Sequence, residues 1–187
     1  YSFGMGDRQF GSIVASVKKD DPEVVYVSGY FFNGGPLVAQ LRAGGVTAPI
    51  VGTEGFDTVN FVQIAKEAAE GVIITTSLDR DTTDPTMRKF IDDYKKRYNV
   101  GAEMVAASTH TAVNVLADAI RKVGIDDPAK LRDAIATTKN MPSAVGTITF
   151  NNSREVYKAA QIQVIKGGEF KRFAVIDDPV LLAPPTY

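Results

Sequence analysis

The sequence predicts an α/β fold built on a doubly wound parallel sheet, and three observations support this class. Short runs rich in β-branched residues follow amphipathic helical stretches, and the runs start near residues 24, 49 and 72. This spacing is the length of one βα unit. The runs are also continuously apolar, as expected for strands that are buried on both faces. We therefore expect three neighbouring parallel strands joined by right-handed crossovers.

Each helix of these βα units has its own start or stop signal. Residues 10–17 carry apolar side chains at helical spacing, which predicts the first helix. Pro36 is expected at the first helical position of the second helix, and Gly44-Gly45 is expected to end it. Either Asp57 or Thr58 is expected to cap the third helix.

The second half of the chain breaks this rhythm. Residues 77–84 are polar and predict a connection between lobes. Three helices follow without a strand between them, and the second, at 102–123, has apolar residues on much of its circumference. β-structure is expected at 146–150, 160–165 and 170–176, and an extended surface strap at 179–187. We divide the chain into residues 1–77, 78–145 and 146–187.

Composition excludes several classes of function. The 187 residues carry a net charge of −1, which gives no basic surface for nucleic acid. The chain has no Cys and one His, so thiol nucleophiles are excluded and a histidine-based metal centre is improbable. Asp79, Asp81 and Asp84 lack the Gly and Glu of a calcium loop and predict a solvated linker. Residues 29–35 have phosphate-loop glycines, but Gly replaces the required Lys. We predict no enzyme, no metal and no cofactor.

The ends of two predicted strands form the best candidate site. One strand ends at Tyr30-Phe31 and the next at Glu54, each beside glycines. Ligands of open parallel sheets bind outside the carboxyl ends of the strands, so Tyr30 and Glu54 are expected on one rim. A carboxylate and a phenol there could hold a ligand's ammonium and cover its apolar part. The alternative is that Glu54 is simply exposed in a turn.

His110 is the second candidate position. It lies inside an otherwise apolar helical stretch at 105–116. A histidine without a second His or a nucleophile nearby is more often a core or hinge residue than a catalytic base.

A series of segments, taken in order along the chain, resembles the leucine/isoleucine/valine-binding family of type I periplasmic solute-binding proteins of ABC transporters. The segments are Gly6-Asp7-Arg8-Gln9-Phe10, residues 21–30, Ala48-Pro49-Ile50-Val51-Gly52-Thr53-Glu54-Gly55, Ala69-Glu70-Gly71-Val72, residues 90–98, the long helix that follows, Asp127-Pro128 and Gly146-Thr147-Ile148-Thr149-Phe150-Asn151. No single segment is decisive, but the ordered series is specific to the family.

The resemblance implies a site and a ligand class. In the family, the residues matching Tyr30 and Glu54 line the cleft between two lobes, and the glutamate meets the ligand's α-ammonium. The ligand-binding set expected here is Tyr30, Glu54, Phe31 and His110. His110-Thr111-Ala112-Val113 stands where the family usually has Tyr-Asp-Ala-Val, so aromatic acids and amides stay open beside branched-chain or related amino acids.

Family members are roughly twice as long as this chain, so the resemblance also implies an incomplete type I fold. Residues 1–77 match the second lobe, 78–145 the returning helices of the first lobe, and 146–187 the last strands of the second lobe and the tail. The expected partners are a small solute, a transporter permease and a missing N-terminal lobe segment. The expected location is periplasmic, or lipid-anchored outside the cytoplasmic membrane. The alternative function is a ligand-sensing domain of a receptor or regulator.

Overall fold

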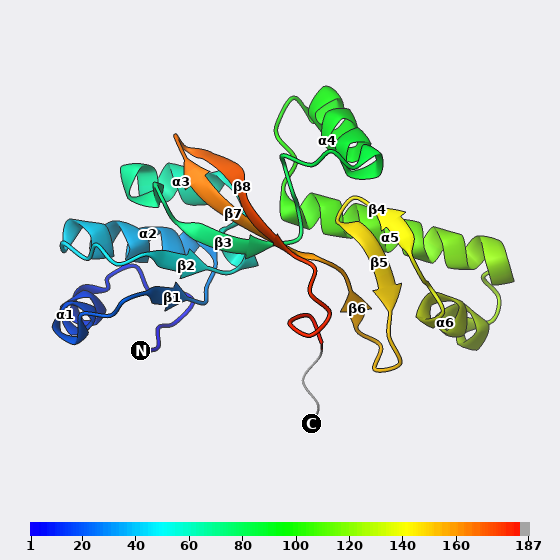
Figure 1. The fold of residues 1–187 in the computed structure, drawn as a ribbon, viewed down its shortest axis with the longest axis horizontal. Coiled ribbons are helices and arrows are strands. Elements are labelled where there is room, and N and C mark those ends of the chain that lie inside the picture. The colour runs from blue at the N-terminus through cyan, green and yellow to red at the C-terminus, as the bar shows by residue number, and fades with distance from the viewer. Residues whose placement is uncertain (184–187) are drawn as a thin grey trace. The chain divides into compact units, whose positions relative to one another are not determined.

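The computed structural model describes residues 1–183, which separate into two compact units (Figure 1). The first unit contains residues 1–76 and 162–174. The second contains residues 77–161 and the described residues after Ala174. The chain thus passes between the units three times, at 76, 161 and 174, whereas the sequence analysis divided it at 77 and 145.

The first unit is built on a five-stranded sheet in the order β1-β2-β3-β7-β8. Its strands are β1 (Val25–Val27), β2 (Ile50–Gly52), β3 (Ile73–Thr76), β7 (Ala160–Lys166) and β8 (Glu169–Ile176). The first three are parallel, which confirms that prediction. β7 and β8 are joined by Gly167-Gly168, both at positive φ, a two-residue turn that makes them an antiparallel hairpin. The sheet is therefore mixed.

Helices connect these strands. They are α1 (Gly11–Asp20), α2 (Phe31–Ala43), α3 (Val59–Ala65) and two 3₁₀ turns, η1 (Glu54–Phe56) and η2 (Lys66–Ala69). Thr58 caps α3, because its hydroxyl oxygen accepts the backbone N–H of Asn60 at 3.3 Å. Asp57, the other candidate cap, is instead buried.

Two details of the first unit differ from expectation. Pro36 is the sixth residue of α2 and not its first. The helix starts earlier because Asn33 Oδ1 accepts the Tyr30 backbone N–H at 2.9 Å, which fixes the first turn before the proline is reached. β1 was expected to be buried on both faces, but Tyr26 is 65% exposed. β1 is the edge strand of the sheet, so fewer neighbours cover it.

The second unit contains three helices and a small antiparallel sheet. The helices are α4 (Pro85–Tyr98), α5 (Met104–Val123) and α6 (Pro128–Ala136), as predicted. The sheet has the order β4-β5-β6, with β4 (Met141–Ser143), β5 (Gly146–Phe150) and β6 (Val156–Tyr157). β4 and β6 were not predicted, since β4 contains Pro142 and β6 is only two residues long.

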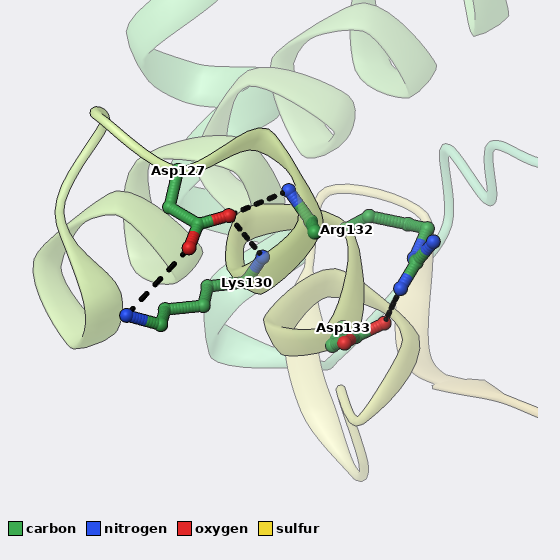
Figure 2. A network of polar contacts seen from close by, with 5 residues as sticks. Asp127, Lys130, Arg132 and Asp133 are labelled. Carbon is green, nitrogen blue, oxygen red and sulfur yellow. Dashed lines mark hydrogen bonds and ion pairs between the residues drawn. The ribbon is translucent and has the colours of Figure 1, made fainter.

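Aspartates cap two helices of the second unit. Asp84 Oδ1 accepts the N–H groups of Thr86 and Met87, both at 2.9 Å. Asp127 Oδ1 accepts those of Ala129 and Lys130 at 3.0 and 3.1 Å, as Figure 2 shows. Asp127 is therefore the N-cap of α6.

The end of the chain was predicted to be a surface strap from 179 to 187. Val180 and Leu181 are 81% and 72% exposed, and residues 184–187 lie outside the described part. Within residues 1–183, none of the helices combines the length and the apolar character that crossing a membrane requires.

Candidate ligand-binding site

The carboxyl ends of β1 and β2 lie against each other in the first unit. Val27 pairs in register with Gly52. One residue further, Thr53 Oγ1 donates a hydrogen bond to the Gly29 carbonyl at 3.2 Å. A Cβ atom on Gly55 would stand 2.1 Å from that same carbonyl oxygen. The loops after the two strands are therefore in direct backbone contact, as the strand-end rule for parallel sheets predicts.

Tyr30 and Glu54 belong to these two touching loops. Tyr30 is the residue before α2, and its side chain is 53% exposed. Glu54 is the first residue of η1 and is also exposed. A Cβ on Gly55 would lie 3.0 Å from Tyr30 Cα, so Glu54 is one residue from backbone contact with Tyr30. The structure thus places Tyr30 and Glu54 on two loops whose backbones are in contact.

Aromatic rings extend the rim next to Tyr30. The rings of Tyr30 and Phe32 are stacked, with centroids 5.6 Å apart and 8° between their planes. Phe31 meets Phe32 edge to face at 5.3 Å. The Arg8 guanidinium lies 5.4 Å from the Phe32 ring centroid, in a cation–π geometry. Phe31, a predicted site residue, is therefore part of a cluster formed by the rings of Tyr30, Phe31 and Phe32 and the Arg8 guanidinium.

The sequence analysis did not single out Phe32 or Arg8. Arg8 lies in the segment before the first helix, far along the sequence from Tyr30-Phe31-Phe32, so nothing in the sequence linked it to these rings. Its backbone carbonyl accepts the Gln40 side-chain N–H at 2.8 Å, which attaches the N-terminal segment to α2. The run of three aromatic residues, Tyr30-Phe31-Phe32, could have indicated that Phe32 belongs to the site.

Buried aromatic rings support the loop that carries Glu54. Phe56, at the end of η1, is fully buried and stacks on Phe61 with ring centroids 4.4 Å apart. Cβ atoms on Gly34 and Gly52 would lie 2.1 and 2.3 Å from the Phe56 ring. The glycines beside the site therefore make room for Phe56, which fixes η1 against β2 and α2. Glu54, two residues before Phe56, is positioned by this packing.

Asp57 adds a buried polar anchor to the same loop. Both Asp57 and Thr76 are about 97% buried, and the Thr76 hydroxyl donates a hydrogen bond to Asp57 Oδ2. Thr76 is the last residue of β3, so the bond ties the loop after β2 to the end of the next strand. Burying a carboxylate is costly unless it is hydrogen-bonded, so this pair favours one fixed loop conformation.

His110 belongs to the second unit, whereas Tyr30, Phe31 and Glu54 belong to the first. Its side chain is exposed on α5, so the core half of the interpretation as a core or hinge histidine is wrong, while the hinge half stays a prediction. The imidazole lies 4.9 Å from the Phe90 ring and 3.2 Å, at Nδ1, from Asn114 Nδ2. With Tyr94 and Tyr98 it lines an open pocket of about 530 Å³ between α4 and α5.

The residues of the first-unit rim are suited to binding and not to bond cleavage. Glu54 offers a carboxylate, Tyr30 a hydroxyl and the neighbouring rings an apolar surface. This combination matches a ligand with a cationic and an apolar part. Within residues 1–183, no group of three or more His, Asp or Glu side chains is placed to hold a metal ion.

A family model described as "periplasmic binding protein" matches residues 1–169. The chain belongs to the periplasmic binding protein family. Members of this family are non-enzymatic binding proteins of transporters, which confirms the prediction that the chain is not an enzyme.

Curated relatives extend this assignment. A Leu/Ile/Val-binding protein homologue from Brucella melitensis is 31% identical over 152 residues, which is 81% of this chain and 41% of that protein. A leucine-, isoleucine-, valine-, threonine- and alanine-binding protein from Pseudomonas aeruginosa is 29% identical over 81% of this chain and 40% of its own length. The resemblance to the leucine/isoleucine/valine-binding proteins is confirmed.

Solved structures confirm the fold. A leucine-binding protein from Thermotoga maritima superposes with a TM-score of 0.90 at 28% identity, over 95% of this chain and 51% of that chain. A branched-chain amino acid transporter binding protein from Streptococcus pneumoniae, solved with isoleucine, gives 0.81 at 28% identity, over 93% and 49%. The predicted α/β fold of the type I periplasmic binding proteins is therefore correct. The chain spans about half the length of the relatives it matches.

Proposed function

We propose that this chain forms part of an extracytoplasmic solute-binding protein of an ABC transporter, which binds a branched-chain or related amino acid. In this proposal the Glu54 carboxylate accepts the ligand's α-ammonium, and Tyr30 and Phe31 cover its apolar side chain. The protein acts outside the cytoplasmic membrane, either free in the periplasm or lipid-anchored, and delivers the ligand to a permease.

The observation that carries the proposal is the contact between the loops that hold Tyr30 and Glu54. A Cβ on Gly55 would overlap the Gly29 carbonyl, so this contact depends on a glycine at that position. An anionic and an aromatic residue on two touching loops support the proposal. The neighbouring relatives named for leucine, isoleucine and valine support the choice of an amino acid as ligand.

The proposal also predicts weak binding by the chain on its own. The rim described here offers the Glu54 carboxylate to an ammonium, and the ligand's carboxylate needs a second partner. In relatives twice as long, the remaining half of the protein is available for that role. Calorimetry on the 187-residue chain should detect no micromolar binding of leucine or isoleucine; a micromolar or tighter dissociation constant would show that the chain already holds a complete site.

Nuclear magnetic resonance can test the Glu54 role, since it detects weak binding. Titration of the ¹⁵N-labelled chain with isoleucine should shift the amide signals of Gly29, Tyr30 and Gly55. The Glu54→Gln variant should weaken this binding roughly tenfold or more, because the charged partner of the ammonium is removed. Glu67→Gln, an exposed glutamate of the same unit, is the matched control and should bind like the unmodified chain.

Ligand analogues separate the two parts of the proposed site. 4-Methylpentanoate lacks the amine and should cause little shift in the unmodified chain, whereas 3-methylbutylamine should still shift the Gly55 signal. Equal binding of isoleucine by the unmodified chain and by Glu54→Gln would reject the role of Glu54. A stronger response to aromatic acids or amides than to isoleucine would reject the proposed ligand class.

A further inference from the structure

The open pocket between α4 and α5 combines aromatic rings with charged groups. One wall is a single face of α4, where the lining residues recur at helical spacing: Phe90, Asp93, Tyr94, Arg97 and Tyr98. The facing wall comes from Ala106 and His110, which are four residues apart on α5. Both helices belong to the second unit, so the pocket lies within one unit and apart from the rim that carries Tyr30 and Glu54.

Four rings form a row along this pocket. The Phe90 ring centroid lies 4.9 Å from that of His110 and 5.8 Å from that of Tyr94. Tyr94 is in turn 4.8 Å from Tyr98. Phe90 is buried and Tyr98 is 55% exposed, so the row leads from the core to the surface. Rings arranged in this way can pack against the face or the edge of a planar aromatic ligand.

The charged groups of the pocket differ in what they contact. Lys89 Nζ and an Asp93 carboxylate oxygen form an ion pair at 2.5 Å, so these two charges offset each other. The Arg97 guanidinium lies 5.7 Å from the Tyr98 ring centroid, and it makes no ion pair with any carboxylate among residues 1–183. The pocket therefore has one cation in excess, placed beside the aromatic row.

This excess cation indicates the chemistry of an occupant. A guanidinium donates two parallel hydrogen bonds to the two oxygens of a carboxylate and also stacks on aromatic faces. A single unpaired cation matches a monoanion better than a dianion such as a phosphate monoester. The pocket volume of about 530 Å³ is within the range of small-molecule sites.

We propose that the pocket between α4 and α5 binds a small aromatic carboxylate of one or two fused rings. Arg97 donates hydrogen bonds to its carboxylate, and the rings of Tyr94, Tyr98 and His110 pack against its aromatic part. Such a ligand has no ammonium for Glu54. The site is therefore a second one, beyond the amino-acid site proposed on the first unit, and it stands or falls separately.

Nuclear magnetic resonance on the ¹⁵N-labelled 187-residue chain tests this site, with 2-naphthoate as the probe. Titration should give saturable shifts of the amide signals of Tyr94, Arg97 and His110, and it should leave Gly29 and Gly55 of the first-unit rim unchanged. 2-Naphthamide has the same rings without the charge. It should bind roughly tenfold more weakly or less, because the guanidinium then has no anion to pair with.

Two variants with the same change of charge locate the contribution of Arg97. Arg97→Met keeps an apolar stem, removes the charge and should weaken 2-naphthoate binding roughly tenfold or more. Lys96→Met is the matched control, because Lys96 is the exposed neighbour of Arg97 on α4 and does not line the pocket. It should bind 2-naphthoate like the unmodified chain. Unchanged amide spectra away from α4 and α5 verify that both variants are folded.

Four results would overturn the proposal. Equal weakening by both variants would show a general attraction of anions to the basic end of α4. Equal binding of 2-naphthoate and 2-naphthamide would show that the carboxylate has no partner in the pocket. Shifts at Gly29 and Gly55 without shifts at His110 would place the probe on the first-unit rim. Shifts that grow linearly without saturation would show that α4 and α5 form no specific site.

Discussion

The two units of this molecule differ in how completely they bury their apolar residues. Among the described residues, the largest fully buried side chains include Phe10, Phe56 and Phe61 of the first unit, whereas Leu78 is the only one from the second. The helices show the same contrast: α2 buries six of its residues, but α6 buries none. Each unit has a buried hydrophobic cluster, but the second also has helices whose apolar surface is only partly covered.

The contrast shows that the candidate site lies on the better-packed unit and that the uncovered apolar surface lies on the other. Phe56 and its two glycines fix the loop that holds Glu54, so the candidate site rests on the well-packed unit. The second unit has exposed apolar residues on α5, among them Val105 and Leu116, and an open aromatic pocket beside His110. We therefore expect substitutions in the core of the first unit to change stability strongly, and substitutions on the surface of either unit to change it little.

The largest effect is expected for Phe56→Ala. The substitution removes a fully buried ring, its stack on Phe61 and its contacts beside Gly34 and Gly52, at a cost of about 3–5 kcal/mol in unfolding free energy. Urea denaturation measures this cost. Phe173→Ala, where the ring is 59% exposed, is the matched control and should cost less than about 1 kcal/mol. A similar cost for both would contradict the contrast between core and surface.

A smaller effect is expected for Gly55→Ala. Its new methyl group would meet the Gly29 carbonyl at 2.1 Å, so the two loops must separate, at a cost of about 1–3 kcal/mol. Gly6→Ala, at a position with no atom within 4 Å, should be nearly neutral. Thermal denaturation followed by circular dichroism compares the two, and Gly55→Ala should also weaken the response of Tyr30 to isoleucine. Equal melting temperatures would show that the loop contact is not rigid.

The βα order of the first unit could be predicted from sequence because each signal is local. Each apolar strand run, each helix face and the Gly44-Gly45 stop lies within a single helix or strand or directly at its end. The start of α2 was predicted wrongly at Pro36. The helix begins at Phe31, because the Asn33 side chain fixes its first turn. The exposure of Tyr26 also escaped prediction, since it depends on which strand lies at the sheet edge.

The candidate site was predictable in part for the same reason. Tyr30 and Glu54 follow successive parallel strands, and parallel neighbours place their carboxyl ends together. Arg8 could not be predicted, because its position over Phe32 depends on how the N-terminal segment folds back onto α2. β4 and β6 were missed because they are short and one contains a proline, so only pairing with β5 defines them.

The smallest difference in unfolding free energy is expected between two surface aspartates of the α6 region, one that caps the helix and one that does not (Figure 2). Asp127 accepts two backbone N–H groups, so Asp127→Ala leaves the helix N-terminus uncapped and should cost about 1 kcal/mol. Asp133 bonds only the neighbouring Arg132 side chain, at 2.5 Å, and both are well exposed. Asp133→Ala should therefore cost about 0–0.5 kcal/mol.

Urea denaturation and hydrogen exchange of the α6 amides measure both variants. Faster exchange confined to α6 in Asp127→Ala is expected, because α6 fully buries none of its residues and meets the core of the second unit through the partly buried Ile135. A loss spread over the amides of α5 and β5 would instead show that α6 is held by tertiary packing. In that case the second unit would be more tightly packed than its exposed apolar residues indicate, and the contrast with the first unit would narrow.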